Sequence, residues 1–335
     1  MKIAINGLGR IGRNVLRAHY ERSPSKDLQI VALNELADLP TLAHLLQYDS
    51  THGQFRGDIK KADGHLLING DTIAVSQVGD INELNWQGID LVLECTGAYA
   101  KRSDAEIHLR NGAKRVLFSQ PASPDVDLTV VYGINHEQLR KEHTIISAAS
   151  CTTYSSVPII KVLDDALGIE NGMITTIHSA MNDQPLIDAY HHTNLRLTRS
   201  AFQSIIPVET GLAKGIERIL PAMAGKFEAQ AIRVPTINVS ALDMTIVVKK
   251  ACSAEDVNQI IKAASNSLPS EVLGYTDEPL ASCDFNHDSR SAIVDLGQTK
   301  VSGRHLVKIL VWFDNEWAYA NRMLDVAKLI SGLAS

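Results

Sequence analysis

The sequence has few cysteines, and none of them lies near another. Cys95, Cys151, Cys252 and Cys283 are widely separated, with no C-x-x-C pair, and no group of histidines has metal-ligand spacing. Disulfide frameworks and structural zinc sites both need such clusters. We therefore expect neither, and no metal cofactor.

Long apolar runs and an excess of positive charge are also missing. No segment approaches the roughly 18 to 20 consecutive apolar residues of a membrane span. Residues 1–7 lead into a glycine loop and lack the charged and apolar regions of a secretory signal. The net charge is -6, from 32 basic and 38 acidic residues. Nucleic acid and membranes are thus not expected as partners, and a cytoplasmic location is expected.

The composition is that of a folded globular protein, and the length of 335 residues suggests two domains. Over residues 1–150, short apolar runs alternate with segments of helical periodicity, which predicts a Rossmann-type, doubly wound parallel α/β sheet. Residues 58–75 differ, because their Asn-Gly turn signal indicates an antiparallel excursion. The apolar runs are residues 2–6, 29–34, 90–95, 115–119, 129–132 and 144–147.

From residue 151 the pattern changes. A helix is predicted from about residue 154 to 167, followed by longer strands rich in Thr, Ile and Val. Their partial alternation favours a second domain of α+β type, residues 151–314, with a mainly antiparallel sheet. The helical segment 315–335 is expected to complete the first domain, residues 1–150.

A G-x-G-x-x-G motif, Gly7, Gly9 and Gly12 with Arg10 and Ile11 between them, follows the first predicted strand and opens a helix. The glycines allow a tight turn, close approach of a pyrophosphate and close helix–strand packing. Glu35 follows the second strand, at the offset of an acid that binds the adenosine ribose. It would repel a 2′-phosphate, so NAD is predicted rather than NADP. The alternative is a plain turn with an exposed Glu35.

Cys151 lies where the helix of the second domain is expected to begin. A helix N-terminus stabilises a thiolate, so a lowered pKa and a nucleophilic role are one interpretation. The other, equally supported by spacing alone, is a small buried hydrophobe, which is our interpretation of Cys95, Cys252 and Cys283. His178 follows an apolar strand, and an imidazole there suits a base for Cys151, although single histidines are more often structural.

Five motifs in order carry a resemblance over the whole chain: INGLGRIGR (5–13), SCTT (150–153), TIHSA (176–180), RVPTINVS (233–240) and DNEW (314–317). The chain resembles the phosphorylating glyceraldehyde-3-phosphate dehydrogenase family. Within it, the segments 34–38, 178–184, 284–295 and 301–317 are most similar to the D-erythrose-4-phosphate dehydrogenase branch, which feeds pyridoxal phosphate synthesis.

The resemblance implies a homotetramer that oxidises a small phosphorylated aldehyde with NAD. Cys151 would be the nucleophile, forming a hemithioacetal and then a thioester, and His178 its base. Cofactor contacts would come from the glycine loop and from Arg10, Ile11, Glu35, Thr96, Gly97, Ser119 and Asn315. Two anion sites would involve Ser150, Thr152, Asp183, Thr210, Gly211 and Arg233.

Several positions depart from the family pattern: Ala148, Tyr154, Met181 and Leu197. Leu197 replaces an arginine that commonly contacts phosphate, and Arg196 or Arg199 are expected to compensate. Weakened binding of inorganic phosphate favours hydrolysis of the thioester to 4-phosphoerythronate. Two alternatives remain: a glycolytic glyceraldehyde-3-phosphate dehydrogenase, and an NAD-binding relative with impaired catalysis and a scaffold or regulatory role.

Overall fold

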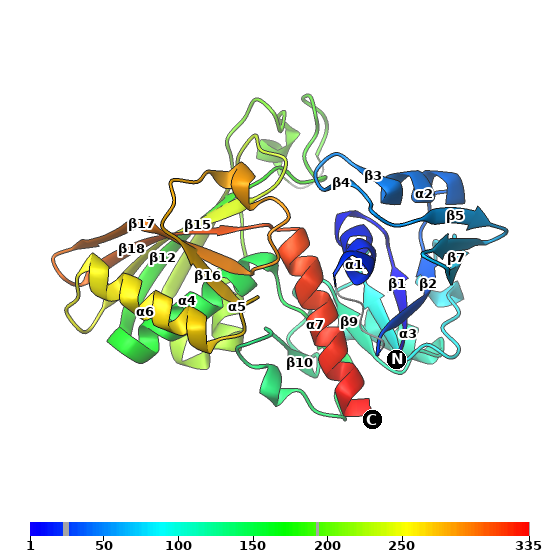
Figure 1. Ribbon diagram of the computed structural model, residues 1–335, viewed down its shortest axis with the longest axis horizontal. Helices are drawn as coiled ribbons and strands as arrows, with labels where there is room; N and C mark the ends of the chain where they lie inside the picture. The colour runs from blue at the N-terminus through cyan, green and yellow to red at the C-terminus, as the bar shows by residue number, and fades with distance from the viewer. Residues whose placement is uncertain (23–26, 192–193, 335) are drawn as a thin grey trace. The chain divides into compact units, whose positions relative to one another are not determined.

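The computed structural model describes residues 1–22, 27–191 and 194–334 (Figure 1). The chain divides into two compact units. The first contains residues 1–150 and 319–335, and the second contains residues 151–318. The boundary at residue 314 expected from the sequence lies earlier than this division, because the last helix, α7 (Trp317–Ala334), contributes its start to the second unit. Residue 335 of the expected helix lies outside the described residues.

The first unit is built on a nine-stranded sheet. Its strands are β1 (Lys2–Asn6), β2 (Gln29–Asn34), β5 (Ile59–Ala62), β6 (His65–Ile68), β7 (Asp71–Ser76), β8 (Leu91–Glu94), β9 (Val116–Phe118), β10 (Leu128–Thr129) and β11 (Ile145–Ser147). Their order is β10-β11-β9-β8-β1-β2-β7-β6-β5. Pairing is parallel from β10 to β7 and antiparallel from β7 to β5. The predicted parallel sheet with an antiparallel excursion is confirmed.

Three helices accompany this sheet: α1 (Arg10–Glu21), α2 (Leu39–Gln47) and α3 (Arg102–Arg110). Helix α1 begins within the glycine loop and buries Val15 and Leu16 on one face. The end of α1 is linked to α7, since the Arg22 guanidinium lies 2.8 Å from the Asp325 carboxylate. Short elements complete the unit: β3 (Tyr48–Asp49), β4 (Gly53–Gln54), η1 (Ile81–Glu83) and η2 (His136–Gln138).

The second unit contains a seven-stranded, mainly antiparallel sheet. Its strands are β12 (Ile169–His178), β13 (Ile206–Val208), β14 (Phe227–Arg233), β15 (Ser240–Val248), β16 (Leu273–Thr276), β17 (Ala292–Ser302) and β18 (Leu306–Phe313). The order is β13-β14-β12-β15-β18-β17-β16, and only β12–β14 and β16–β17 pair in parallel. The predicted α+β arrangement is confirmed.

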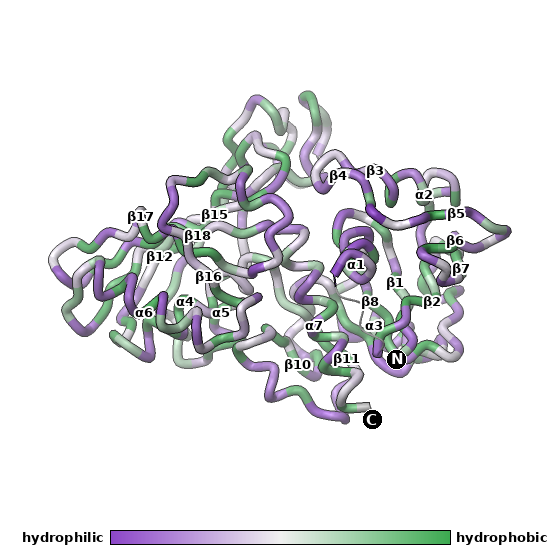
Figure 2. The backbone as a smooth tube through the Cα atoms, viewed as in Figure 1, coloured by the Kyte–Doolittle hydropathy of each residue, from purple (hydrophilic) through white to green (hydrophobic). Residues whose placement is uncertain are grey.

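Helices α4 (Cys151–Leu167), α5 (Leu212–Ile219) and α6 (Ala254–Ser267) pack on this second sheet and on one another. Along β15, Leu242, Met244 and Ile246 are buried, while the residues between them keep part of their surface exposed. Such alternation leaves one sheet face against the helices. In Figure 2, green hydrophobic stretches run through the strands and helices of this unit. Turns η3 (Leu195–Thr198), η4 (Pro221–Met223) and η5 (Ser282–Phe285) join the elements.

The structure differs from the sequence expectation at the start of the helix that carries Cys151. Helix α4 begins at Cys151 rather than near residue 154, so the cysteine is in its first turn. Strand β17, the longest in the unit, was not expected, because Gly297 and Gln298 interrupt its apolar pattern. In the described part of the chain, no helix is both long and apolar enough to cross a membrane.

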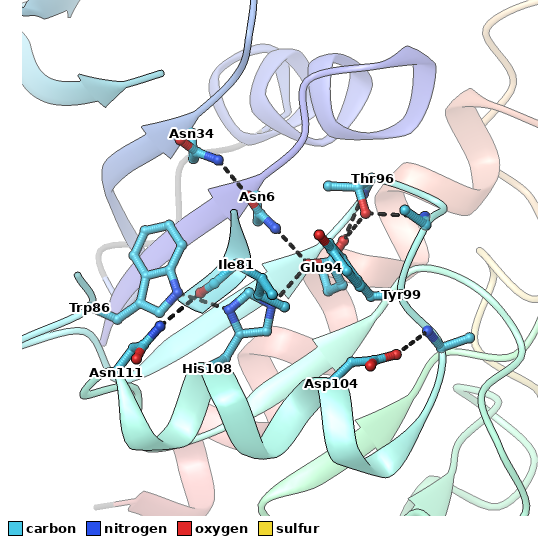
Figure 3. Close-up of polar contacts among 12 residues, drawn as sticks. Asn6, Asn34, Ile81, Trp86, Glu94, Thr96, Tyr99, Asp104, His108 and Asn111 are labelled. Carbon is cyan, nitrogen blue, oxygen red and sulfur yellow. Dashed lines mark hydrogen bonds and ion pairs between the residues drawn. The ribbon is translucent and has the colours of Figure 1, made fainter. Parts of the chain in front are cut away.

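A buried polar network joins the carboxyl ends of β1, β2 and β8 (Figure 3). The Glu94 carboxylate accepts hydrogen bonds from Asn6 Nδ2, at 2.6 Å, and from the backbone N–H of Thr96, at 2.8 Å. His108 Nε2 lies 2.9 Å from the same carboxylate, and Trp86 Nε1 donates to His108 Nδ1 at 2.8 Å. An indole N–H only donates, so Nδ1 accepts and the His108 proton resides on Nε2.

Trp86→Phe tests the importance of this network for stability. The change leaves the buried Nδ1 of His108 without a donor, and we expect a loss of about 2–3 kcal/mol in the free energy of unfolding. Trp312→Phe is the matched control, because the Trp312 indole donates to Asp295 over a longer 3.3 Å contact and is less buried. Chemical denaturation of the two variants compares them, and equal losses would contradict the proposed role of the His108 contact.

Candidate functional site

The glycine loop of the first unit has the geometry of a phosphate-binding turn. Gly7 adopts a φ of +87°, which favours glycine. A Cβ on Gly12 would lie 2.0 Å from the carbonyl oxygen of Gly7, so this glycine permits close packing within the loop. A Cβ on Gly9 would meet no atom within 4 Å. The open space beside Gly9, at the start of α1, fits the approach of a pyrophosphate.

A cavity of about 450 Å³ adjoins this loop. It lies at the carboxyl ends of β1, β2 and β8, where the strand order reverses direction and where open α/β sheets bind dinucleotides. Its lining includes Gly7, Gly9, Glu35, Thr96 and Tyr99. The residues present therefore fit the NAD that the motif predicts.

Glu35 has a structural role that its spacing did not reveal. One carboxylate oxygen accepts from the backbone N–H of Leu8 at 2.7 Å, and the other accepts from Leu36 N at 2.8 Å and Ala37 N at 3.3 Å. Glu35 thus holds the glycine loop while lining the cavity. Each carboxylate oxygen has more than one acceptor site, so these bonds are compatible with a ribose contact.

The other predicted cofactor residues of the first unit differ in whether they line this cavity. Thr96 lines it, and the Glu94 carboxylate fixes the Thr96 backbone. Gly97 follows with a φ of +76°, and the Ser119 backbone N–H donates to the Glu94 carbonyl. Arg10, by contrast, forms an ion pair with Asp49 at 2.5 Å, which lowers the pKa of that carboxyl against the effect of burial. Ile11 is half-buried in α1.

In the second unit, the thiol of Cys151 faces the imidazole of His178. The Sγ atom lies 4.0 Å from His178 Nε2, at the outer limit of a hydrogen bond to sulfur. His178 is the last residue of β12, and its ring packs edge-on against Phe313. The structure therefore brings the predicted nucleophile and base together. Apo enzymes often hold catalytic pairs at such long distances, which shorten when substrate binds.

Burial governs the ionisation of this pair. It raises the pKa of the Cys151 thiol to about 11, even though the Arg233 charge and the N–H groups of Thr152 and Cys151 act in the opposite direction. Burial and the Arg233 charge together lower the pKa of His178 to about 4. Of the two interpretations of Cys151, the lowered thiol pKa is contradicted, because desolvation outweighs the effect of the helix start.

Arg233 was predicted only as an anion-binding residue, but it also contacts His178. The two residues are register partners at the ends of the parallel strands β12 and β14. Arg233 Nη1 lies 2.6 Å from His178 Nδ1. The same Nδ1 lies 2.9 Å from the carbonyl oxygen of Ser179. This contact is set by strand pairing across the sheet, so no local sequence signal reveals it.

Asn315, the predicted carboxamide-binding residue, is held by two serines that sequence reasoning missed. Its Oδ1 accepts from Ser240 Oγ at 2.9 Å and from Ser179 Oγ at 3.1 Å, and Ser240 Oγ accepts from the Ser179 N–H at 3.1 Å. Both serines are buried. With Oδ1 engaged by two hydroxyls, the amide orientation is fixed and Nδ2 has no acceptor among the described residues.

Two helix starts lie close together beside the thiol. A Cβ on Gly215 of α5 would come within 2.9 Å of the Thr153 hydroxyl of α4, so the first turns of the two helices pack closely. The predicted anion ligands Thr152, Thr210 and Gly211 lie at these starts. Thr210 Oγ1 accepts from the N–H of Leu212 at 3.3 Å. Ser150 directly precedes the helix of Cys151, and the charge of the exposed Asp183 acts on Arg233.

We expected Arg196 or Arg199 to compensate for the arginine that Leu197 replaces, but neither contacts Cys151 or His178 in the described part of the chain. Arg199 forms an exposed ion pair with Asp188 at 3.2 Å, and Arg196 is exposed on η3. Leu197 is 8% exposed and packs inward.

The class of protein follows from these two units. A dinucleotide-binding sheet with a glycine loop, in a chain whose other unit holds a thiol beside an imidazole, has the features of an NAD-dependent dehydrogenase. Residues 1–102 match the NAD binding domain of glyceraldehyde 3-phosphate dehydrogenase, and residues 150–315 match its C-terminal domain. The chain belongs to the glyceraldehyde-3-phosphate dehydrogenase family.

Gly9→Ala and Gly12→Ala separate cofactor binding from folding. A methyl group at position 9 enters open space, so the cofactor-free protein should keep its stability while NAD affinity falls by about tenfold or more. A methyl group at position 12 collides with the Gly7 carbonyl and should cost about 1–3 kcal/mol of stability. Calorimetric titration with NAD and thermal unfolding measure both. Unchanged NAD affinity in Gly9→Ala would contradict the assignment of the loop.

The raised pKa of Cys151 predicts how its alkylation depends on pH. In protein free of NAD and phosphate, the rate of alkylation by iodoacetamide should rise about tenfold per pH unit from about pH 7 to about pH 10, because only the thiolate reacts. Peptide mass spectrometry follows Cys151 separately from the exposed Cys283. A plateau below about pH 8 would mean that the thiolate is already formed.

Proposed function

We propose that the chain oxidises D-erythrose 4-phosphate to 4-phosphoerythronate with NAD, and thereby supplies pyridoxal phosphate synthesis. The observation that carries the reaction type is the Cys151–His178 contact in the catalytic domain of an aldehyde-phosphate dehydrogenase family. The substrate is inferred from segments 34–38, 178–184, 284–295 and 301–317. The buried Leu197 supports weak binding of inorganic phosphate and hence hydrolysis.

In the proposed mechanism, the sulfur of Cys151 adds to the aldehyde carbon as its proton passes to His178 Nε2. The N–H groups of Cys151 and Thr152 already face the sulfur, so they are suited to stabilise the oxyanion that forms beside it. The imidazolium returns its proton to that oxygen to give the hemithioacetal. His178 then accepts the hydroxyl proton as the carbon loses hydride, which NAD accepts when bound. After the imidazolium has released this proton to solvent, neutral His178 takes a proton from the water molecule that adds to the thioester carbon. The C–S bond then breaks, and the proton passes from His178 to the departing sulfur of Cys151, which frees the acid.

We also propose a homotetramer in the cytoplasm. Leu186, Ile187, Tyr190 and Leu195 are all at least 67% exposed in the single chain. Exposed apolar side chains that are close in sequence are typical of a surface covered by another subunit. This support concerns an interface between copies of the chain, and the number of subunits is inferred from the family.

The substrate is tested by steady-state kinetics with D-erythrose 4-phosphate and glyceraldehyde 3-phosphate, each with and without inorganic phosphate. We expect kcat/KM to favour the tetrose by about tenfold or more, with no phosphate requirement. Cys151→Ser should lower kcat by about a thousandfold or more and leave NAD affinity unchanged, whereas Cys283→Ser is the control. Preference for the triose with an absolute phosphate requirement would identify the glycolytic activity instead. NAD binding without NADH formation from either aldehyde would indicate impaired catalysis.

A further inference from the structure

A strained turn lies directly before the proposed nucleophile. Ala149, between the end of β11 and the start of α4, adopts a φ of +53°, in the left-handed region that favours glycine. A methyl side chain cannot offset the steric cost of this conformation with a local hydrogen bond, as asparagine can. Such residues persist only where their surroundings hold them, and they cluster at functional sites. The contacts around Ala149 therefore have to hold the turn.

Two buried hydroxyl groups hold the backbone of this turn. Ser147 Oγ accepts from the Ala149 N–H at 3.1 Å and donates to the Gln120 carbonyl oxygen at 2.8 Å. Tyr319 Oη donates to the Ala149 carbonyl oxygen at 2.9 Å, and the Ala148 carbonyl oxygen lies 3.4 Å from the same hydroxyl. Both hydroxyl-bearing residues are at most 4% exposed. The peptide groups on both sides of Ala149 are thus engaged.

The two hydroxyl groups act on different sides of the turn. Ser147 is local in sequence and holds the peptide group by which the chain enters the turn. Tyr319 is 170 residues further along the chain, on α7, and holds the peptide group by which the chain leaves the turn. It belongs to the first unit, which the chain leaves after Ser150 and rejoins at Tyr319. Tyr319 therefore restrains the direction in which the chain continues to Cys151.

We propose that Tyr319 is a positioning residue that holds Ala149 in the left-handed conformation and thereby sets the backbone N–H and the sulfur of Cys151. Without the hydroxyl, Ala149 would relax toward negative φ, because the cost of the left-handed conformation and the net contribution of one buried hydrogen bond are similar in size. The N–H groups of Cys151 and Thr152, which face the sulfur, would move with the chain. The role in catalysis rests on the proposed function, in which these groups stabilise the oxyanion.

Tyr319→Phe removes the hydroxyl and keeps the ring that fills the buried space. We expect kcat to fall about three- to tenfold with either phosphorylated aldehyde that the enzyme oxidises, as for the loss of one buried hydrogen bond. The affinity for NAD, measured by calorimetric titration, should not change, because the contact lies at the turn before Cys151. Tyr20→Phe is the matched control and should keep the wild-type kcat, since the Tyr20 hydroxyl donates to Asp71 at 3.1 Å in the same unit.

Ala149→Gly distinguishes this role from a general loss of packing. Glycine adopts positive φ without steric cost, so the turn should depend much less on the hydroxyl. In the Ala149→Gly background, Tyr319→Phe should lower kcat by less than about twofold. The same rescue should appear in the free energy of unfolding, measured by chemical denaturation. It should also appear in the rate at which iodoacetamide alkylates Cys151 at one fixed pH, which Tyr319→Phe alone should lower.

Equal losses of kcat in the two backgrounds would overturn the proposal, as would an unchanged kcat in Tyr319→Phe or a loss explained by weaker NAD binding. If Tyr319→Phe does not fold, the double variant should fold, and its failure beside a folded Ala149→Gly protein would also overturn the proposal. Absence of turnover with both aldehydes would contradict the proposed function instead. The unfolding and alkylation measurements need no turnover, and equal effects in the two backgrounds would then refute the role of Tyr319.

Discussion

Burial of the Cys151 thiol is the constraint on which the catalytic unit depends. Desolvation disfavours the thiolate more than Arg233 and the start of α4 favour it, and it disfavours the imidazolium in the same way. In the proposed mechanism, the proton passes from the sulfur to His178 Nε2 within the site, so the contact between these two atoms matters more than the charge of either group alone.

In both units, hydrogen bonds at the ends of strands hold a polar group in place. In the first, the buried carboxylate of Glu94 joins Asn6 to Thr96, beside the glycine loop. In the second, Ser179 and Ser240 fix the amide of Asn315. Buried polar groups are stable when they are hydrogen-bonded, and their partners restrict their orientation. Thr96 and Asn315, both predicted to bind the cofactor, are thus held in place by hydrogen bonds to neighbouring side chains.

Motifs and their spacing predicted the features whose residues lie close together in the sequence. The glycine loop, its helix and Glu35 lie within one strand–helix–strand unit, so their spacing carries the information. The ionisation of Cys151 and the contact of Arg233 with His178 depend instead on burial and on the register of β12 against β14. Register is decided by packing of whole strands, and a motif does not record it. The family resemblance predicted Arg233 as an anion ligand and did not reveal its contact with His178.

The structure shows where the residues that depart from the family pattern lie. Tyr154 is 1% exposed and Leu197 is 8% exposed, so both belong to the packed interior. Arg199 is engaged by Asp188. Within the described residues, Arg233 is then the guanidinium in contact with the catalytic pair. Under the proposed function, this guanidinium is the charged group that holds the phosphate of the substrate beside Cys151 and His178.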